Sequence, residues 1–152
     1  RDILLPSYTI GSFVKDLHER MGDEVFDSLY EAGKAHGELA VNEMARENKM
    51  SEQEFITKAA DTAEVMGMGK FTVRELQMDK RATVELEDSP IVEVLKELEM
   101  EEEIDRPVDS LIAGILQGIS SEIIREGEVE VRETQCEFLG ADHCEFIITR
   151  KQ

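Results

Sequence analysis

The sequence predicts an α+β fold in which N-terminal helices pack on an antiparallel sheet and the chain ends in a β-hairpin. Apolar residues recur at steps of three and four over roughly the first third of the chain, which is typical of amphipathic helices. Apolar and polar residues alternate in two later regions, 71–86 and 129–149, as in strands with one buried face. Strand and helix patterns do not follow one another regularly, and this argues against a parallel sheet.

The first two helices are expected over residues 9–21 and 23–44, separated by Gly22. Helical spacing is shown by the apolar residues Ile10, Phe13, Val14, Leu17 and Met21, and then by Val25, Phe26, Leu29, Ala32, Ala35 and Leu39. Gly33 and Gly37 lie inside the second helix, where a glycine costs up to about 1 kcal/mol relative to alanine. We therefore expect another segment to pack closely against them.

A third helix and a pair of strands follow. Ser51 and Glu54 form a capping box ahead of the third helix, and Gly67 marks its end. Over residues 71–86 the period changes to two, which predicts two antiparallel strands that meet near Asp79.

Two further helices are expected before the last hairpin. Ser89 and the proline after it suit the cap and first position of a short helix, which leads into a solvated acidic connector at 97–105. Pro107 is expected to open the next helix, in which Gly114 and Gly118 permit close contact with a helix or a ligand.

The final hairpin contains both cysteines of the chain, Cys136 and Cys144, on opposite sides of a turn near Gly140. Glu133 shares the strand phase of Val129 and Val131, whereas Cys136 has the other phase, so a bulge at Thr134 and Gln135 is needed to bring the carboxylate beside the thiols. Two thiolates and a carboxylate suit zinc, which then needs a fourth ligand. On spacing alone, buried unreactive cysteines or a disulfide are the more common explanation.

Two segments of the second half, RPVDSLIAGILQGI at 106–119 and VRETQCEFLGADHCEFII at 131–148, resemble the signature segments of the 4-vinyl-reductase domain family. The matching residues of the second segment are Glu133, Cys136, Gly140, Cys144 and Phe146. The earlier YEAGKAHGE at 30–38 is similar to the family's helix with spaced glycines. Family members include sensor domains of aromatic-responsive bacterial transcription activators, in which three cysteines and a glutamate hold zinc beside the effector pocket.

The resemblance implies that Glu133, Cys136 and Cys144 occupy three of those four ligand positions. Asp109 stands where the family has the cysteine of its Pro-Val-Cys motif, and an aspartate is also a zinc ligand. His143 is a rival for the fourth position, although as the neighbour of Cys144 it is expected to point to the opposite face of the strand.

Composition and charge restrict the partners of the protein. The chain of 152 residues is expected to form a single domain over 1–152. Its 35 acidic and 17 basic residues give a net charge of -18, which repels nucleic acid and anionic membrane surfaces. Apolar runs of the roughly 20 residues that span a bilayer are missing, and the two cysteines suggest reduced thiols, so we expect a cytoplasmic protein.

Three functions compete at this level. The best supported is a binding or sensory domain for a small hydrophobic molecule, with a structural zinc ion. The family name suggests a tetrapyrrole vinyl-reductase or its accessory carrier, but no G-x-G-x-x-G, P-loop or flavin motif is evident, so an enzyme is disfavoured. The third is a dimeric scaffold, because the family's fold resembles TRAPP subunits and haem-NO-binding domains. The resemblance, together with the apolar first helix, also implies a homodimer.

Overall fold

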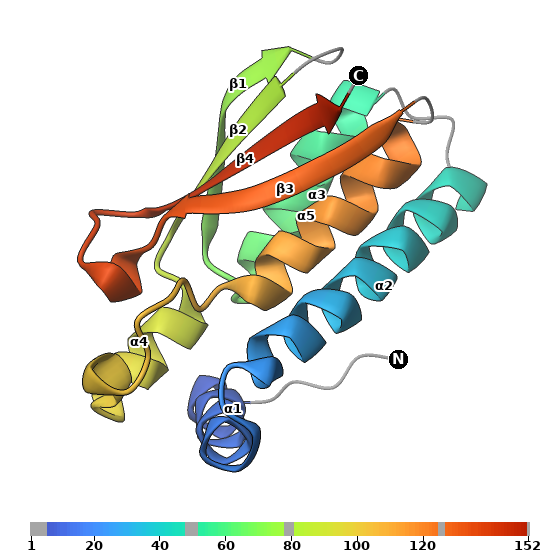
Figure 1. Cartoon of the computed structure of the whole chain (residues 1–152). Helices are drawn as coiled ribbons and strands as arrows, with labels where there is room; N and C mark the ends of the chain where they lie inside the picture. Colours follow the sequence, from blue (N-terminus) through green and yellow to red (C-terminus); the bar gives the residue numbers. More distant parts are fainter. Residues whose placement is uncertain (1–5, 48–51, 78–80, 125–126, 152) are drawn as a thin grey trace.

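The computed structural model describes residues 6–47, 52–77, 81–124 and 127–151, which form an α+β fold with a four-stranded antiparallel sheet (Figure 1). In chain order the elements are α1 (Ser7–Met21), α2 (Glu24–Glu47), α3 (Glu52–Val65), β1 (Lys70–Gln77), β2 (Arg81–Glu87), α4 (Pro90–Glu97), the 3₁₀ helix η1 (Met100–Glu102), α5 (Ser110–Ile123), β3 (Glu128–Gln135), the 3₁₀ helix η2 (Glu137–Leu139) and β4 (Cys144–Lys151). The fold class predicted from the sequence is confirmed. None of the described helices is long and apolar enough to cross a membrane.

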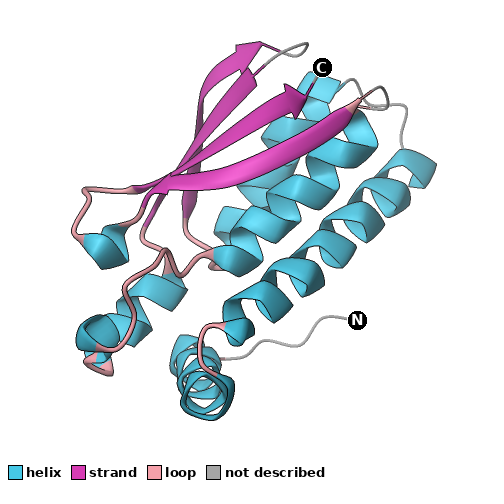
Figure 2. Ribbon diagram, in the orientation of Figure 1, coloured by secondary structure: helices cyan, strands magenta, loops and turns pink. Residues whose placement is uncertain are grey.

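The sheet joins two hairpins in the order β1-β2-β4-β3, with every neighbouring pair antiparallel. Helices α3 and α5 lie against one face of the sheet, and α2 lies beyond α5 (Figure 2). The inward residues of the central strands, Val84, Leu86, Phe146 and Ile148, are buried and belong to the core. Period-two alternation therefore directs one face of the sheet toward the helices.

Helices α2 and α5 cross backbone to backbone at four glycines, Gly33, Gly37, Gly114 and Gly118. A Cβ atom at Gly114 would lie 2.1 Å from the carbonyl oxygen of Tyr30, and one at Gly118 would lie 2.2 Å from that of Lys34. Distances this short are never tolerated by real side chains, so only glycine allows the approach. The close packing expected at these glycines is present, and the neighbouring segment is a helix.

The prediction that Pro107 opens α5 is wrong, because the helix begins at Ser110. Val108 and Asp109 are fully buried, and the backbone of Asp109 has φ -83° and ψ 35°, outside the helical range. The chain delays its helix by these residues so that one side chain enters the core and the other turns toward the end of the sheet.

Other local predictions have mixed outcomes. Ser89 caps α4 by accepting a hydrogen bond from the Val92 N–H at 3.4 Å, as predicted. The acidic connector exposes its glutamates, yet it is anchored by two buried apolar side chains, Met100 and Ile104. His18, expected on a polar face, is 11% exposed and packs against Phe26. Neither the capping box at Ser51 nor the turn near Asp79 falls within the described residues.

Candidate metal centre and apolar cavity

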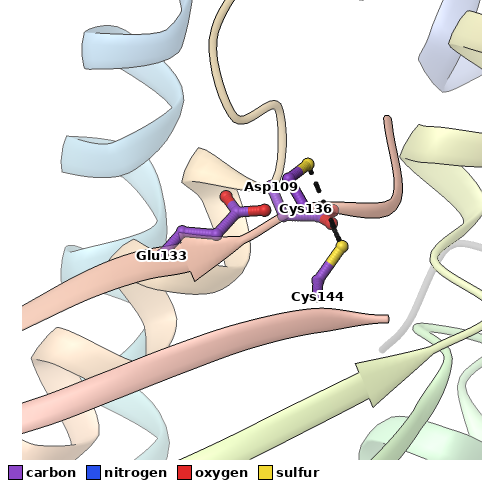
Figure 3. A group of neighbouring side chains, drawn as sticks. All are labelled: Asp109, Glu133, Cys136 and Cys144. Carbon is purple, nitrogen blue, oxygen red and sulfur yellow. Dashed lines mark hydrogen bonds between the residues drawn. The ribbon is translucent and has the colours of Figure 1, made fainter. Parts of the chain in front are cut away.

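Four side chains that could ligate a metal ion meet at one end of the sheet: Asp109, Glu133, Cys136 and Cys144 (Figure 3). One ligand atom from each lies within 4.8 Å of those from the others. Asp109 directly precedes α5, Glu133 is on β3, Cys136 follows β3 and Cys144 is the first residue of β4. The structure thus brings together all four residues that the sequence indicated, from three elements.

A bulge in β3 makes this convergence possible. Glu133 lies opposite Phe146, but the next pair is Gln135 with Glu145, so Thr134 is the extra residue. The bulge predicted at this point is confirmed. Cys136 lies just after β3 rather than within the strand, and its carbonyl oxygen accepts the N–H groups of Leu139 and Ala141 at 3.0 and 3.2 Å.

Short polar contacts fix the orientation of the group. The Sγ of Cys144 lies 3.1 Å from Oδ2 of Asp109 and 4.0 Å from Sγ of Cys136. A thiol has one proton, so Cys144 can donate to only one of these partners at a time. The backbone N–H of Glu137 donates to the Sγ of Cys144 at 3.3 Å, and the Ser89 hydroxyl donates to Oδ1 of Asp109 at 2.6 Å.

Burial and mutual hydrogen bonding change the acidity of every member of the group. Burial raises the pKa of Asp109 to about 6 and, with the negative charge of Asp109 beside it, raises the pKa of Glu133 to about 10. The hydrogen bond from Cys144 lowers the pKa of Cys136 to about 5, and the same bond together with burial raises the pKa of Cys144. The carboxyl groups therefore hold their protons to unusually high pH unless a cation neutralises them.

The donor set and its spacing suit a tetrahedral cation that accepts sulfur and oxygen. Two thiolates bound to zinc at about 2.3 Å in tetrahedral geometry lie about 3.8 Å apart, close to the 4.0 Å between the two Sγ atoms here. Oε1 of Glu133 is buried and has no hydrogen-bond partner in the protein, and such an atom is costly unless something binds it. These residues form a possible metal-binding group.

Asp109, rather than His143, completes this group. The Nε2 of His143 lies 3.8 Å from Oε1 of Glu85, on the neighbouring strand. Strand alternation turns His143 away from its neighbour Cys144, as expected from the sequence.

A second feature was not predicted in any detail from the sequence: an apolar cavity of about 210 Å³ between the sheet and the helices α3 and α5. Representative lining residues are Ala60, Ala63, Val84, Ile115, Leu116 and Ile148. Three alanines of α3 take part, Ala59 as well as Ala60 and Ala63, and their small side chains leave space that larger residues would fill. That run of alanines is the sequence signal that could have indicated the cavity.

The metal-binding group and the cavity share two elements. On β4, Cys144 belongs to the group and Ile148 lines the cavity, with the fully buried Phe146 between them on the same face. On α5, Ile112 lines the cavity one helical turn after Asp109. A change in either feature is therefore next to the other.

Comparison with protein families decides the relationship of the chain. Residues 83–150 match the model of the 4VR (vinyl-4-reductase) domain. The chain carries a 4VR domain. All four members of the metal-binding group lie inside the matched segment, so the resemblance inferred from the sequence is confirmed. Comparison with curated proteins finds no match.

Solved structures extend the 4VR relationship to the whole fold. The phenol-responsive sensory domain of the transcription activator PoxR, solved with phenol, matches with a TM-score of 0.82 and 19% identity over 99% of this chain and 77% of that one. A vinyl-4-reductase family protein from Methanocaldococcus jannaschii matches with 0.61 and 22% over 100% and 84%. A trafficking protein particle complex subunit 3 from Naegleria fowleri, covalently bound to palmitic acid, matches with 0.67 and 16% over 96% and 95%. At these identities the 4VR chain shares their fold.

Proposed function

We propose that this 4VR chain is a ligand-binding sensory domain for a small hydrophobic molecule and that a structural zinc ion stiffens it. The cavity between α3, α5 and the sheet is the observation that carries the proposal. Its volume of about 210 Å³ exceeds the roughly 150 Å³ of a cavity that binds benzene, so it has room for one substituted ring or a short aliphatic chain. An apolar lining with few polar groups is typical of small-molecule sites.

Two of the structural neighbours support this proposal. The PoxR domain is named as phenol-responsive and was solved with phenol. The trafficking subunit is covalently bound to palmitic acid. The same fold therefore accommodates a small aromatic molecule in one protein and an aliphatic acid in another.

The cavity volume does not favour the tetrapyrrole function. A tetrapyrrole has four linked rings, whereas the cavity exceeds one that holds a single benzene ring by only a modest factor. We therefore do not place a vinyl-reductase substrate in it.

We further propose that zinc is held by Asp109, Glu133, Cys136 and Cys144. Four protein ligands make a closed site, which is characteristic of structural rather than catalytic zinc. The ion would neutralise the buried carboxylates and tie the start of α5 to β3 and β4. It would also give Oε1 of Glu133 the partner that the protein does not supply.

A homodimer formed through α1 is the remaining part of the proposal. Tyr8 and Phe13 on this helix are 56% and 59% exposed, which is unusual for large apolar side chains unless a partner covers them. Gel filtration with light scattering tests it. We expect a dimer for the wild type and a monomer for Phe13→Glu, and a wild-type monomer at all concentrations would contradict it.

The ligand proposal is tested by thermal shift and calorimetry with a panel of phenol, methylphenols and benzyl alcohol. Wild-type protein should bind at least one of them, and Ala63→Phe, which fills the cavity, should abolish binding. Ala35→Phe adds the same bulk on the exposed face of α2, outside the cavity lining, and should bind as the wild type does. Absence of binding by the wild type, or undiminished binding by Ala63→Phe, would contradict the proposal.

Metal analysis of purified protein tests the zinc proposal. We expect one zinc ion per wild-type chain and almost none in the Cys136→Ser/Cys144→Ser double variant or in Glu133→Gln. Glu130→Gln is the matched control, because Glu130 is on the same strand but pairs with Arg132 instead of joining the group. Zinc content that survives in the double cysteine variant would rule the site out.

A further inference from the structure

The charge of the cavity lining differs in sign from that of the protein. The chain contains 35 acidic and 17 basic residues, so carboxylates outnumber cations by two to one. Among the described residues that line the cavity, none is acidic, and the formally charged side chains are Arg81 and Arg150. An otherwise apolar lining thus carries a positive charge within a strongly negative molecule.

Both arginines lie at the same end of the sheet. Arg81 begins β2 and lies opposite Thr149 on β4, so it is next to Arg150 across the strand pair. On β4 the residues Phe146, Ile148 and Arg150 alternate onto one face, and the first two point into the core or the cavity. The positive end of the cavity is therefore at the opposite end of β4 from Cys144 and the metal-binding group.

The existing contacts of these arginines leave them able to bind an anion. The nearest carboxylate to Arg81 in an ion pair is that of Glu75, whose Oε2 is 3.9 Å from Nε, at the outer limit for such a contact. Arg150 is half-buried and also interacts within the protein. A guanidinium group has five N–H donors in a planar fork, so it can accept a carboxylate while it keeps another partner.

We propose that the cavity binds an amphipathic monoanion, whose apolar body of one ring or a short chain fills it and whose carboxylate pairs with Arg81 and Arg150. This inference rests on the proposed function and names the ligand class of the same cavity. The apolar lining selects the body by size, and the two guanidinium groups select the charged end through paired hydrogen bonds. A single charge is favoured because the net charge of -18 opposes the entry of more highly charged anions.

Matched pairs of ligands test the proposal by calorimetry on the full chain at pH 7.5. Benzoate is compared with benzyl alcohol, and hexanoate with hexanol, so that each pair shares an apolar body and differs in charge. We expect the acid to bind at least tenfold more tightly than the alcohol in one of the pairs. The pair that shows the preference distinguishes an aromatic from an aliphatic ligand.

Arginine variants assign the preference to the cavity. Arg150→Gln should lower the affinity for the acid to that for the alcohol and leave the alcohol unchanged, with a smaller loss for Arg81→Gln. Arg150→Lys keeps the charge and should retain part of the preference even if the glutamine variant folds poorly. Arg132→Gln is the control, since Arg132 is an exposed arginine bonded to Glu130 outside the cavity.

The outcomes separate this inference from the function on which it rests. Equal affinities for acid and alcohol, with no effect of the arginine variants, would overturn it and keep the ligand-binding proposal. The arginines would then only cover the cavity with their aliphatic stems. Acid binding that survives in Ala63→Phe would also overturn it, because the anion would lie outside the cavity. If neither acids nor neutral single-ring compounds bind, both proposals fail.

Discussion

The Ser89 hydroxyl donates a hydrogen bond of 2.6 Å to Oδ1 of Asp109, and Oδ2 of the same carboxylate lies 3.1 Å from the Sγ of Cys144. Ser89 precedes α4 and accepts the N–H of Val92 as its helix cap. One buried serine therefore both starts a helix and orients a member of the metal-binding group. Outer hydrogen bonds of this kind tune the affinity of metal sites.

Substitution of this serine should weaken zinc binding. We expect Ser89→Ala to lower zinc affinity about 10- to 100-fold, because the carboxylate loses the bond that orients it. Loss of the helix cap should also lower the free energy of unfolding by about 1 kcal/mol. Competition with a chelator measures the first effect and urea denaturation the second. Ser89→Thr, which keeps the hydroxyl, is the control, and an unchanged zinc affinity in Ser89→Ala would count against the role of Ser89.

Replacement of Asp109 should change zinc affinity in opposite directions for two variants. Asp109→Cys supplies a third thiolate at the position where the resembling family has cysteine, so it should bind zinc at least as tightly as the wild type. Asp109→Asn removes the charge with little change of shape and should bind at least tenfold more weakly. Chelator competition measures both variants, and equal affinity in Asp109→Asn and the wild type would remove Asp109 from the ligand set.

Metal-stripped protein should lose stability as the pH rises from about 4 to 6. Asp109 has a pKa of about 6 in the folded protein against an ordinary 3.8, so the folded state binds more protons in this window. At 1.36 kcal/mol per pKa unit, the stability of the wild type should fall by on the order of 3 kcal/mol relative to Asp109→Asn.

The comparison with Asp109→Asn isolates this carboxyl group, because the raised pKa of Glu133 and the lowered pKa of Cys136 act with opposite signs at higher pH. Urea denaturation at several pH values, with chelator present, measures the effect. Zinc-loaded wild type should show the reverse trend, since zinc binding releases protons. Parallel pH profiles for stripped wild type and Asp109→Asn would show that Asp109 is not perturbed.

The glycine crossing should tolerate no side chain. Gly114→Ala places a Cβ against the backbone oxygen of Tyr30, which no rotamer change can relieve, so we expect a loss of about 3 kcal/mol or more in the free energy of unfolding. Gly67→Ala is the control, because open space surrounds this glycine and only its φ of +76° resists substitution. The control should lose about 1 kcal/mol. Denaturation with urea measures both, and a Gly114→Ala protein as stable as the control would contradict the crossing.

Local patterns in the sequence were enough to predict the elements that neighbouring residues determine. The phase difference between Val131 and Cys136 required a bulge, and the structure has one at Thr134. Ser89 and Pro90 begin α4 as their capping chemistry predicts. Pro107 misled because proline suits the start of a helix, whereas here the burial of Val108 and Asp109 outweighs that preference and delays the helix.

The candidate site was predictable only in part for the same reason. Cys136 and Cys144 belong to one hairpin, so hairpin geometry places them together. Asp109 comes from a distant segment, and family resemblance rather than spacing indicated it. The cavity was not specified in advance because α3, α5 and three strands line it, and residues such as Ala63 and Leu116 look like ordinary core in the sequence.

The crossing of α2 and α5 determines which wall of the cavity can yield. Because their backbones touch at Gly33, Gly37, Gly114 and Gly118, the two helices move as one beam with no side chains between them to repack. On the other side of the cavity, α3 has no fully buried residue among those described. A ligand that needs extra room will therefore push α3 outward, and any mechanical signal of occupancy leaves the domain through that helix.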